Sequence, residues 1–399
     1  MTGDATVGIG RVGVSLTVAV LIVSGCSAAP SGPGASASAR GSVASSSASS
    51  SPVPSYLKLL GGCGVALPAS WQPALTAGRL AHGPGESLIV QSVSGRPDAV
   101  AVSRAAPDWS GLELVHLDGS VRRVHAFDDP DTDQILGVAS DGRYWVWSQT
   151  HSVYNWDDWT LWSFDAVTGR VRQVARSTVA ANGEPVPGPF LFPAAQDGQA
   201  AWSRGNPDGT STLYLTDLAT GRSRVAATGH PSTPLFAHHL LVWPESPAPG
   251  ALSQLRAADP TTLRPAELPA ALRQVRGPNW LTADGDRLVW ASADYTQLYT
   301  WTWANPNEAP RRLLDVGPAE HIGQPHATGD LIAWAGDHAM FAYDLRSDAV
   351  TQLTAEYGGV AVAGTLLAVS EQETTVKSTH PVLSVTLVDT TKLPPLPGC

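Results

Sequence analysis

The chain has 399 residues, of which 15% are charged, and its formal net charge is −10. This negative balance, without a cluster of Lys or Arg, speaks against a nucleic-acid partner. The low charge fits a chain of stacked β-strands, and the 14 tryptophans suit flat side chains packed between twisted sheets.

The first 25 residues have the pattern of an export signal. Arg11 precedes an apolar run, residues 12–23, that is too short to span a bilayer. The run ends in Val23-Ser24-Gly25-Cys26, which resembles the lipobox of bacterial lipoproteins. The resemblance implies that Cys26 is acylated and becomes the new N-terminus, which would anchor the exported chain to the outer face of the cytoplasmic membrane. A plain secretory signal with a chance cysteine is the alternative.

Residues 26–55 consist almost entirely of Ser, Ala, Gly and Pro. Such a segment cannot bury a core and is predicted to be a disordered tether. Its reach is on the order of 30 Å by the square-root scaling of flexible linkers. The remaining residues, 56–399, are the predicted folded domain.

A unit of four short strands repeats along the folded domain. In residues 135–175 the turn Asp141-Gly142 separates the first strand from the second, residues 144–147, which is apolar at every position. A continuously apolar short strand is typical of one that is covered on both faces. The second strand recurs at spacings of 45, 55, 41, 47, 44 and 35 residues, with its anchors at Val102, Trp147, Trp202, Trp243, Trp290, Trp334 and Val369. This period is typical of four-stranded propeller blades.

The turns of the unit recur as well. Asp-Gly pairs stand at residues 197–198 and 284–285, and residues 217–222 nearly repeat residues 165–170. In these features the unit resembles the TolB-type, WD40-like propeller repeat, over roughly residues 86–398. The resemblance implies an all-β fold, a seven-bladed β-propeller of four-stranded antiparallel blades. An irregular pair of β-sandwiches is the alternative.

Two cysteines are predicted to form a disulfide. With Cys26 assigned to the lipid anchor, Cys63 and Cys399 remain, one at each end of the folded domain. Because the last blade of a propeller meets the first, the two ends of the domain lie close together, and thiols outside the cytoplasm oxidise. We therefore expect a Cys63–Cys399 disulfide, with two unrelated free thiols as the alternative.

Binding is expected on the face that carries the loops between second and third strands and the links between blades, because these loops vary most in length. The most distinctive loop contains Tyr154, Trp156, Asp157 and Asp158. Aromatic rings can stack on a sugar or a cation, while carboxylates accept hydroxyl protons or positive charge. The structural alternative is that Trp159 begins the third strand and packs between blades, with the Asp pair in a turn.

Two further sets on this face have the residue types of metal sites. Asp129, Asp131 and Asp133 match the opening of a calcium loop, but Gln134 and Ser140 occupy the Gly and Glu positions of an EF-hand. A looser calcium site or a solvated acidic turn remains.

Histidines form the second set. His321 and His326 precede the sixth blade, with Asp337 and His338 in its next loop, and could bind zinc or carry protons. Surface histidines are the alternative. The sequence contains no HExxH, GxSxG or P-loop motif.

These observations favour a lipid-anchored propeller that binds a glycan or an envelope protein and carries out no chemistry. The alternative is a carbohydrate-active or metal-assisted enzyme that uses Asp157, Asp158 and the histidines of the same face. A third hypothesis is a structural partner that docks by its outer strands. No cofactor is predicted beyond the calcium hypothesis.

Overall fold

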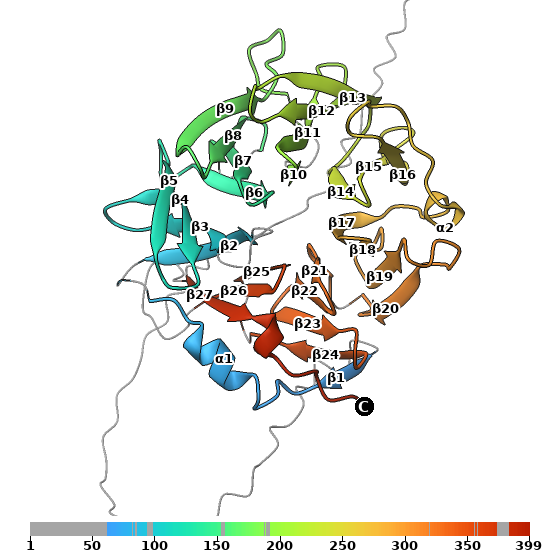
Figure 1. Cartoon of the computed structure of the whole chain (residues 1–399). Helices are drawn as coiled ribbons and strands as arrows, with labels where there is room; N and C mark the ends of the chain where they lie inside the picture. The colour runs from blue at the N-terminus through green and yellow to red at the C-terminus, as the bar shows by residue number, and fades with distance from the viewer. Residues whose placement is uncertain are drawn as a thin grey trace, which may run out of the picture. The chain divides into compact units, whose positions relative to one another are not determined.

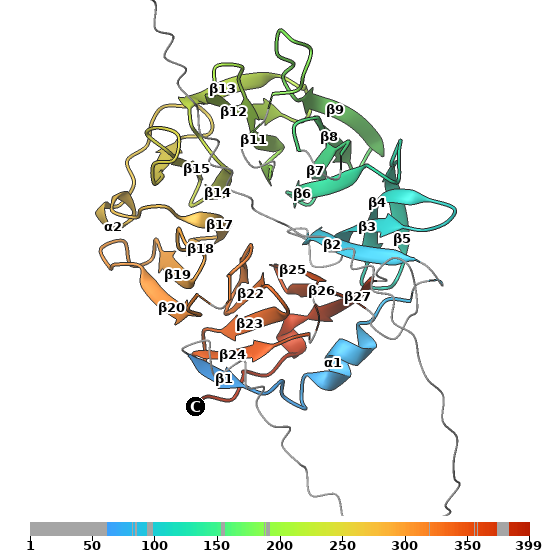
Figure 2. The ribbon, with the colours of Figure 1, turned by 180° about the vertical axis from the view of Figure 1, so that it is seen from behind.

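The computed structural model describes residues 62–81, 83, 86–93, 99–152, 156–186, 188, 192–318, 320–354, 356, 358–372 and 383–399. The predicted signal segment, the tether and Cys26 lie outside the described residues. Residues 50–399 contain a seven-bladed β-propeller, in which the blades stand around an axis and the strands of each blade run outward in chain order (Figures 1 and 2). The predicted fold class is confirmed.

Four blades are regular four-stranded antiparallel sheets. Blade 1 consists of β2 (Ser87–Val93), β3 (Ala99–Ala105), β4 (Ser110–His116) and β5 (Val121–Ala126). Blade 2 consists of β6 (Gln134–Ser140), β7 (Tyr144–Thr150), β8 (Trp159–Asp165) and β9 (Arg170–Arg176). Blade 3 consists of β10 (Ala194–Gln196), β11 (Gln199–Gly205), β12 (Ser211–Asp217) and β13 (Ser223–Gly229). Blade 5 consists of β17 (Asn279–Asp284), β18 (Arg287–Ala291), β19 (Gln297–Thr302) and β20 (Arg311–Asp315).

Blade 4 has a reduced outer edge. Its strands are β14 (Leu235–Ala237), β15 (Leu240–Glu245) and β16 (Gln254–Ala258), and its fourth position is a single bridge between Ala258 and Pro265. A short helix, α2 (Ala270–Arg273), follows at the rim between blades 4 and 5 (Figure 1).

The N-terminal segment completes blades 6 and 7. Blade 6 contains β21 (His326–Thr328), β22 (Leu331–Ala335), β23 (Met340–Asp344) and β24 (Ala349–Gln352). Blade 7 contains β25 (Gly358–Ala363), β26 (Leu366–Gln372) and β27 (Leu383–Asp389). Strand β1 (Cys63–Val65) adds to β24 in parallel. Helix α1 (Gln72–Ala77) then leads to residues 78–80, which pair with β27: Leu80 N–H donates to Val385 and Leu387 N–H to Gly78, both at 2.8 Å. The blue β1 and α1 thus lie beside the orange and red strands of the last two blades (Figures 1 and 2).

The C-terminal residues fasten this closure. After the 3₁₀ helix η2 (Thr390–Lys392), the chain returns to β1, where Cys399 forms the predicted disulfide with Cys63. The fully buried Trp71 donates its indole N–H to the carbonyl of Pro394 at 2.9 Å. The backbone N–H of Leu396 donates to the buried carboxylate of Asp344, also at 2.9 Å. The predicted disulfide is therefore confirmed, and it belongs to a packed seam.

The repeated aromatic residues are core. All seven anchors lie on second strands and are at most 5% exposed. Four anchors stack on an aromatic ring that faces them from the third strand: Trp147 on Trp162, Trp202 on Tyr214, Trp290 on Tyr299 and Trp334 on Phe341. Within the described ranges, no helix is both long and apolar enough to cross a membrane.

Arginines on outer strands join neighbouring blades. Each donates to the turn that follows the third strand of the next blade. The bonds to backbone carbonyls run from Arg122 to Ala166 (2.9 Å), from Arg172 to Leu218 (2.7 Å) and from Arg224 to Thr261 (2.7 Å). In blade 5, Arg311 instead pairs with the Asp348 carboxylate of blade 6.

Candidate functional site

The two faces of the ring are those that strand parity predicts. Asp133, in the link before blade 2, contacts His151 in the loop after β7, and His321, in the link before blade 6, contacts Asp337 in the loop after β22. We call this side the link face. On the opposite side, the turn face, Asp141 accepts a hydrogen bond from the N–H of Gly198 in the next blade at 2.7 Å.

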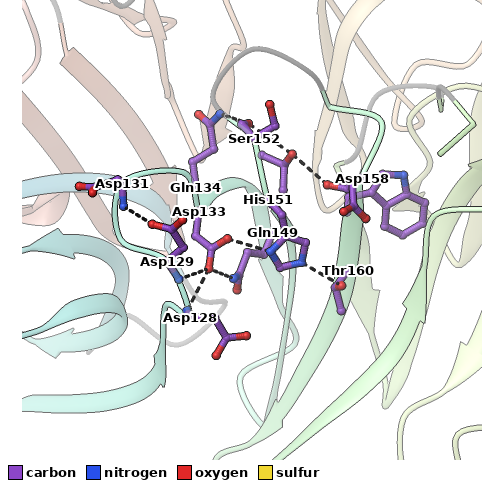
Figure 3. A network of polar contacts seen from close by, with 12 residues as sticks. Asp128, Asp129, Asp131, Asp133, Gln134, Gln149, His151, Ser152, Asp158 and Thr160 are labelled. Carbon is purple, nitrogen blue, oxygen red and sulfur yellow. Dashed lines mark hydrogen bonds and ion pairs between the residues drawn. The ribbon is translucent and has the colours of Figure 1, made fainter. Parts of the chain in front are cut away.

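Asp133 is the centre of a polar network on the link face (Figure 3). Its side chain is 1% exposed, and Oδ1 lies 2.7 Å from Nδ1 of His151. Oδ2 accepts from the backbone N–H groups of Asp128 (3.0 Å) and Asp129 (3.2 Å) and from Nε2 of Gln149 (3.0 Å). A buried carboxylate needs such donors to offset its lost hydration. We call these groups the Asp133 network.

The network lies at the base of the loop between β7 and β8. Gln134 donates to the carbonyl of Ser152 at 2.8 Å, and the carbonyl of Asp158 accepts from His151 N–H (3.1 Å) and from the Thr150 hydroxyl (3.0 Å). Both ends of the loop are therefore fixed to the sheet.

The predicted ligand-binding residues of this loop have different environments. Tyr154 lies outside the described residues. Trp156 is half-buried and packs against the cluster of Trp159 and Trp202, and Trp159 begins β8 at 1% exposure, as the structural alternative states. Asp157 is half-buried, and burial raises the pKa of its carboxyl. Asp158 is exposed and accepts a long hydrogen bond, 3.4 Å, from the hydroxyl of Ser177.

The acidic run before blade 2 is a hydrogen-bonded turn. Asp129 accepts from the N–H of Asp131 at 3.0 Å, while both oxygens of Asp133 already have protein donors. Among the residues that the structure describes, no group of three or more His, Cys, Asp or Glu side chains is arranged to hold a metal ion. A calcium ion bound by Asp133 would replace its present hydrogen-bond partners. The calcium site stays a prediction.

The two predicted histidines do not share an environment. His321 is exposed, with Nδ1 2.9 Å from the Asp337 carboxylate. His326 is the first residue of the innermost strand β21, where burial lowers the pKa of the imidazole to about 4 although the residue keeps some contact with solvent. His326 is therefore neutral at neutral pH, whereas His321 stands beside a carboxylate at the surface.

Sequence reasoning missed the carboxylate next to His321. Glu320 is 2% exposed, and its Oε1 accepts from the N–H of Asp337. Its Oε2 is buried and has no hydrogen-bond partner among the residues that the structure describes. Burial, with a smaller contribution from the nearby Asp337 charge, raises the pKa of Glu320.

Sequence reasoning also missed the pairing of Asp133 with His151, which follows from the register of β6 and β7. Gln134 and Thr150 are register partners, so the residues that flank them, Asp133 and His151, face each other.

Comparison with solved structures finds the fold in proteins of very different sequence. An oligogalacturonate lyase in complex with manganese gives a TM-score of 0.52 at 11% identity, covering 78% of this chain and 93% of that chain. A prolyl endopeptidase gives 0.50 at 14% identity, covering 88% of this chain and 52% of that chain, so this chain spans about half of the peptidase. TolB from Acinetobacter baumannii gives 0.39 at 11% identity, covering 76% and 63%.

Comparison of the sequence with models of protein families and with curated proteins gives no match. These identities are low, so the solved structures show the propeller fold alone.

Proposed function

We propose that the chain is an exported lipoprotein whose propeller binds a ligand at the cell envelope. The observation that carries this proposal is the Cys63–Cys399 disulfide at the ring closure. Disulfides of this kind persist in oxidising compartments and are rare in the cytosol. Together with the lipobox-like sequence before Cys26, the disulfide supports an anchor on the outer face of the cytoplasmic membrane.

The binding surface in this proposal is the loop between β7 and β8. Gln134 holds one end of the loop at Ser152, and Thr150 and the backbone N–H of His151 hold the other end at Asp158. Asp157 and Asp158 are therefore presented to a ligand with little ordering cost. Carboxylates suit the hydroxyl groups of a glycan or the basic side chains of an envelope protein.

Fractionation of cells tests the anchor. The full chain should incorporate a labelled fatty acid and partition with membranes. Cys26→Ser should lose both properties while keeping its disulfide, and Ser36→Ala in the tether should behave as the parent chain does. A Cys26→Ser variant that remains acylated and membrane-bound would contradict the proposal.

Capture from envelope extracts tests the binding loop. The propeller should retain a glycan or protein ligand that the Asp157→Ala/Asp158→Ala variant loses. Asp108→Ala removes an exposed carboxylate from the loop after β3 and is the matched control. Equal capture by all three proteins would exclude this loop as the binding surface.

A second candidate function, an enzyme, has one observation in its favour. The Nε2 of His151 lies 3.3 Å from the hydroxyl of Thr160, while its Nδ1 contacts the Asp133 carboxylate (Figure 3). The imidazole therefore connects the carboxylate to the hydroxyl group. This arrangement can move a proton away from a hydroxyl group. Turnover on a glycan panel that His151→Gln or Thr160→Val abolishes would establish an enzyme that uses these groups in place of the binding protein.

A further inference from the structure

Three departures from the repeat meet on the turn face between blades 4 and 5. The turn between β14 and β15 is His238-His239, where other blades use a turn with Gly. Blade 4 lacks a full fourth strand and has α2 after its outer edge. Strand β19 ends at Thr302, where the third strands of other blades lead into Asp, and Trp303 follows it.

The His238-His239 turn keeps a strained backbone. Its residues have φ of 46° and 64°, in the left-handed region that disfavours side chains with a Cβ. The corresponding turn of blade 3 has Asp197 at φ 49° but a glycine, Gly198, at its second position, and the turns of blades 5, 6 and 7 also have a glycine at positive φ, namely Gly285, Gly329 and Gly364. Blade 4 alone among these turns has two residues with a Cβ at positive φ and no glycine. A local conflict of this kind is expected where a side chain has a role that the backbone conformation alone does not require.

His238 holds Trp303 in a fixed orientation. The two rings stack with centroids 5.2 Å apart and an interplanar angle of 11°. Nδ1 of His238 lies 2.8 Å from the carboxylate of Asp286 in the next blade, and the buried Trp301 packs edge-on against Trp303 at 4.9 Å. The Trp303 ring is therefore oriented in advance of any ligand.

The oriented ring lines an open groove of about 470 Å³. Leu240, Leu268 and Pro269 supply apolar surface, and Asn307 and the ion pair of Glu267 with Arg273 supply polar groups. The volume lies in the range of small-ligand sites. Glu267 provides hydrogen-bond acceptors and Arg273 provides donors. Because their charges are opposite, the groove has no excess of positive or negative charge from this pair.

We propose that this groove binds a neutral saccharide, with one pyranose ring against Trp303. The apolar C–H face of a sugar complements the negative face of an indole. Its hydroxyl groups both donate and accept, which matches the mixed polar groups of Glu267, Arg273 and Asn307. The groove lies on the turn face, whereas the Asp133 network lies on the link face, so this site and the proposed function can fail independently.

Titration of the full, disulfide-bonded chain by indole N–H NMR tests the site. The probes are maltose, cellobiose, N,N′-diacetylchitobiose and a proline-rich peptide. At least one disaccharide should shift the Trp303 resonance saturably. Because Trp303→Ala removes this resonance, the variants are compared by isothermal titration calorimetry with the same disaccharide. Trp303→Ala should weaken binding about tenfold or more, whereas Trp109→Ala, which truncates a half-buried tryptophan at the loop after β3, should not.

Glycine variants of the turn separate positioning from stability. His238→Gly relieves the strained backbone, so its melting temperature should be unchanged or higher while saccharide binding weakens. His239→Gly relieves the same kind of strain and should keep binding. The proposal is overturned if no disaccharide shifts Trp303, if only the peptide does, or if His238→Gly lowers the melting temperature and leaves binding intact.

Discussion

Three buried carboxylates are compensated in different ways. Asp133 accepts from Gln149, from two backbone N–H groups and from His151. Burial raises the pKa of Asp344, but hydrogen bonds from Arg346 and from the N–H of Leu396 outweigh burial and lower it overall. Among the described residues, one oxygen of Glu320 has no hydrogen-bond partner, and burial raises its pKa. The balance between hydrogen-bond donors and burial therefore has opposite outcomes at Asp344 and Glu320.

Replacement of Asp133 should loosen the loop between β7 and β8. Asp133→Asn puts an amide where donors converge, so we expect a loss of about 2 kcal/mol in the free energy of unfolding, with faster amide exchange at residues 151–152. Asp131→Asn, at an exposed position of the same turn, should stay within about 0.5 kcal/mol. Equal losses in both variants would contradict the role assigned to the Asp133 network.

The raised pKa of Glu320 predicts a pH-dependent effect. Protonation favours the folded state, so Glu320 costs no stability below its ordinary pKa of 4.5 and costs progressively more as the pH rises through its folded value. Glu320→Gln should therefore raise the free energy of unfolding at neutral pH and leave it unchanged near pH 4, as urea titrations would show.

The exposed Glu184→Gln is the control, with no expected effect at either pH. A Glu320→Gln variant that is less stable at neutral pH would show that the ionised carboxylate has a partner.

At the scale of elements, local patterns predict the blades but not their closure. The Asp-Gly turns and apolar second strands identify β6 to β9 because these signals lie within one unit. The parallel addition of β1 to β24 joins Cys63 to Ala349 in register, a pairing between distant residues that no local pattern encodes.

The same distinction applies to the candidate site. The sequence places Asp157, Asp158 and His321 on one face through strand parity. The sequence leaves open whether the aromatic residues of this loop bind a ligand or pack in the core, because the residue type alone does not fix burial; the structure places Trp159 in the core. The network around Asp133 depends on the register of β6 and β7, and the pairing of Gln134 with Thr150 is known only once that register is fixed.

The outer-strand arginines predict a measurable contact between blades. Arg172→Ala removes the bond to the carbonyl of Leu218 and should lower the free energy of unfolding by about 1 kcal/mol. Arg170→Ala, an exposed arginine at the start of the same strand, should have a smaller effect. Chemical denaturation compares the two; equal stability would mean that these bonds do not join the blades energetically.

At the scale of the whole molecule, the ring depends on its seam. Cys63→Ser/Cys399→Ser removes a cross-link across 336 residues, and the loop-entropy model gives a loss of up to about 6 kcal/mol. Amide exchange should accelerate first in β1, α1, β24 and β27, which form the seam, and later in blades 2 and 3. Cys26→Ser is the control, because Cys26 is not a partner in this disulfide.

Mass mapping of the protein from the envelope of its native host, digested without reduction, tests the account most directly. We predict a peptide that links Cys63 to Cys399 and an N-terminal peptide that begins at an acylated Cys26. Free thiols at Cys63 and Cys399, with an unacylated Cys26, would contradict both the clasped ring and its place at the cell envelope.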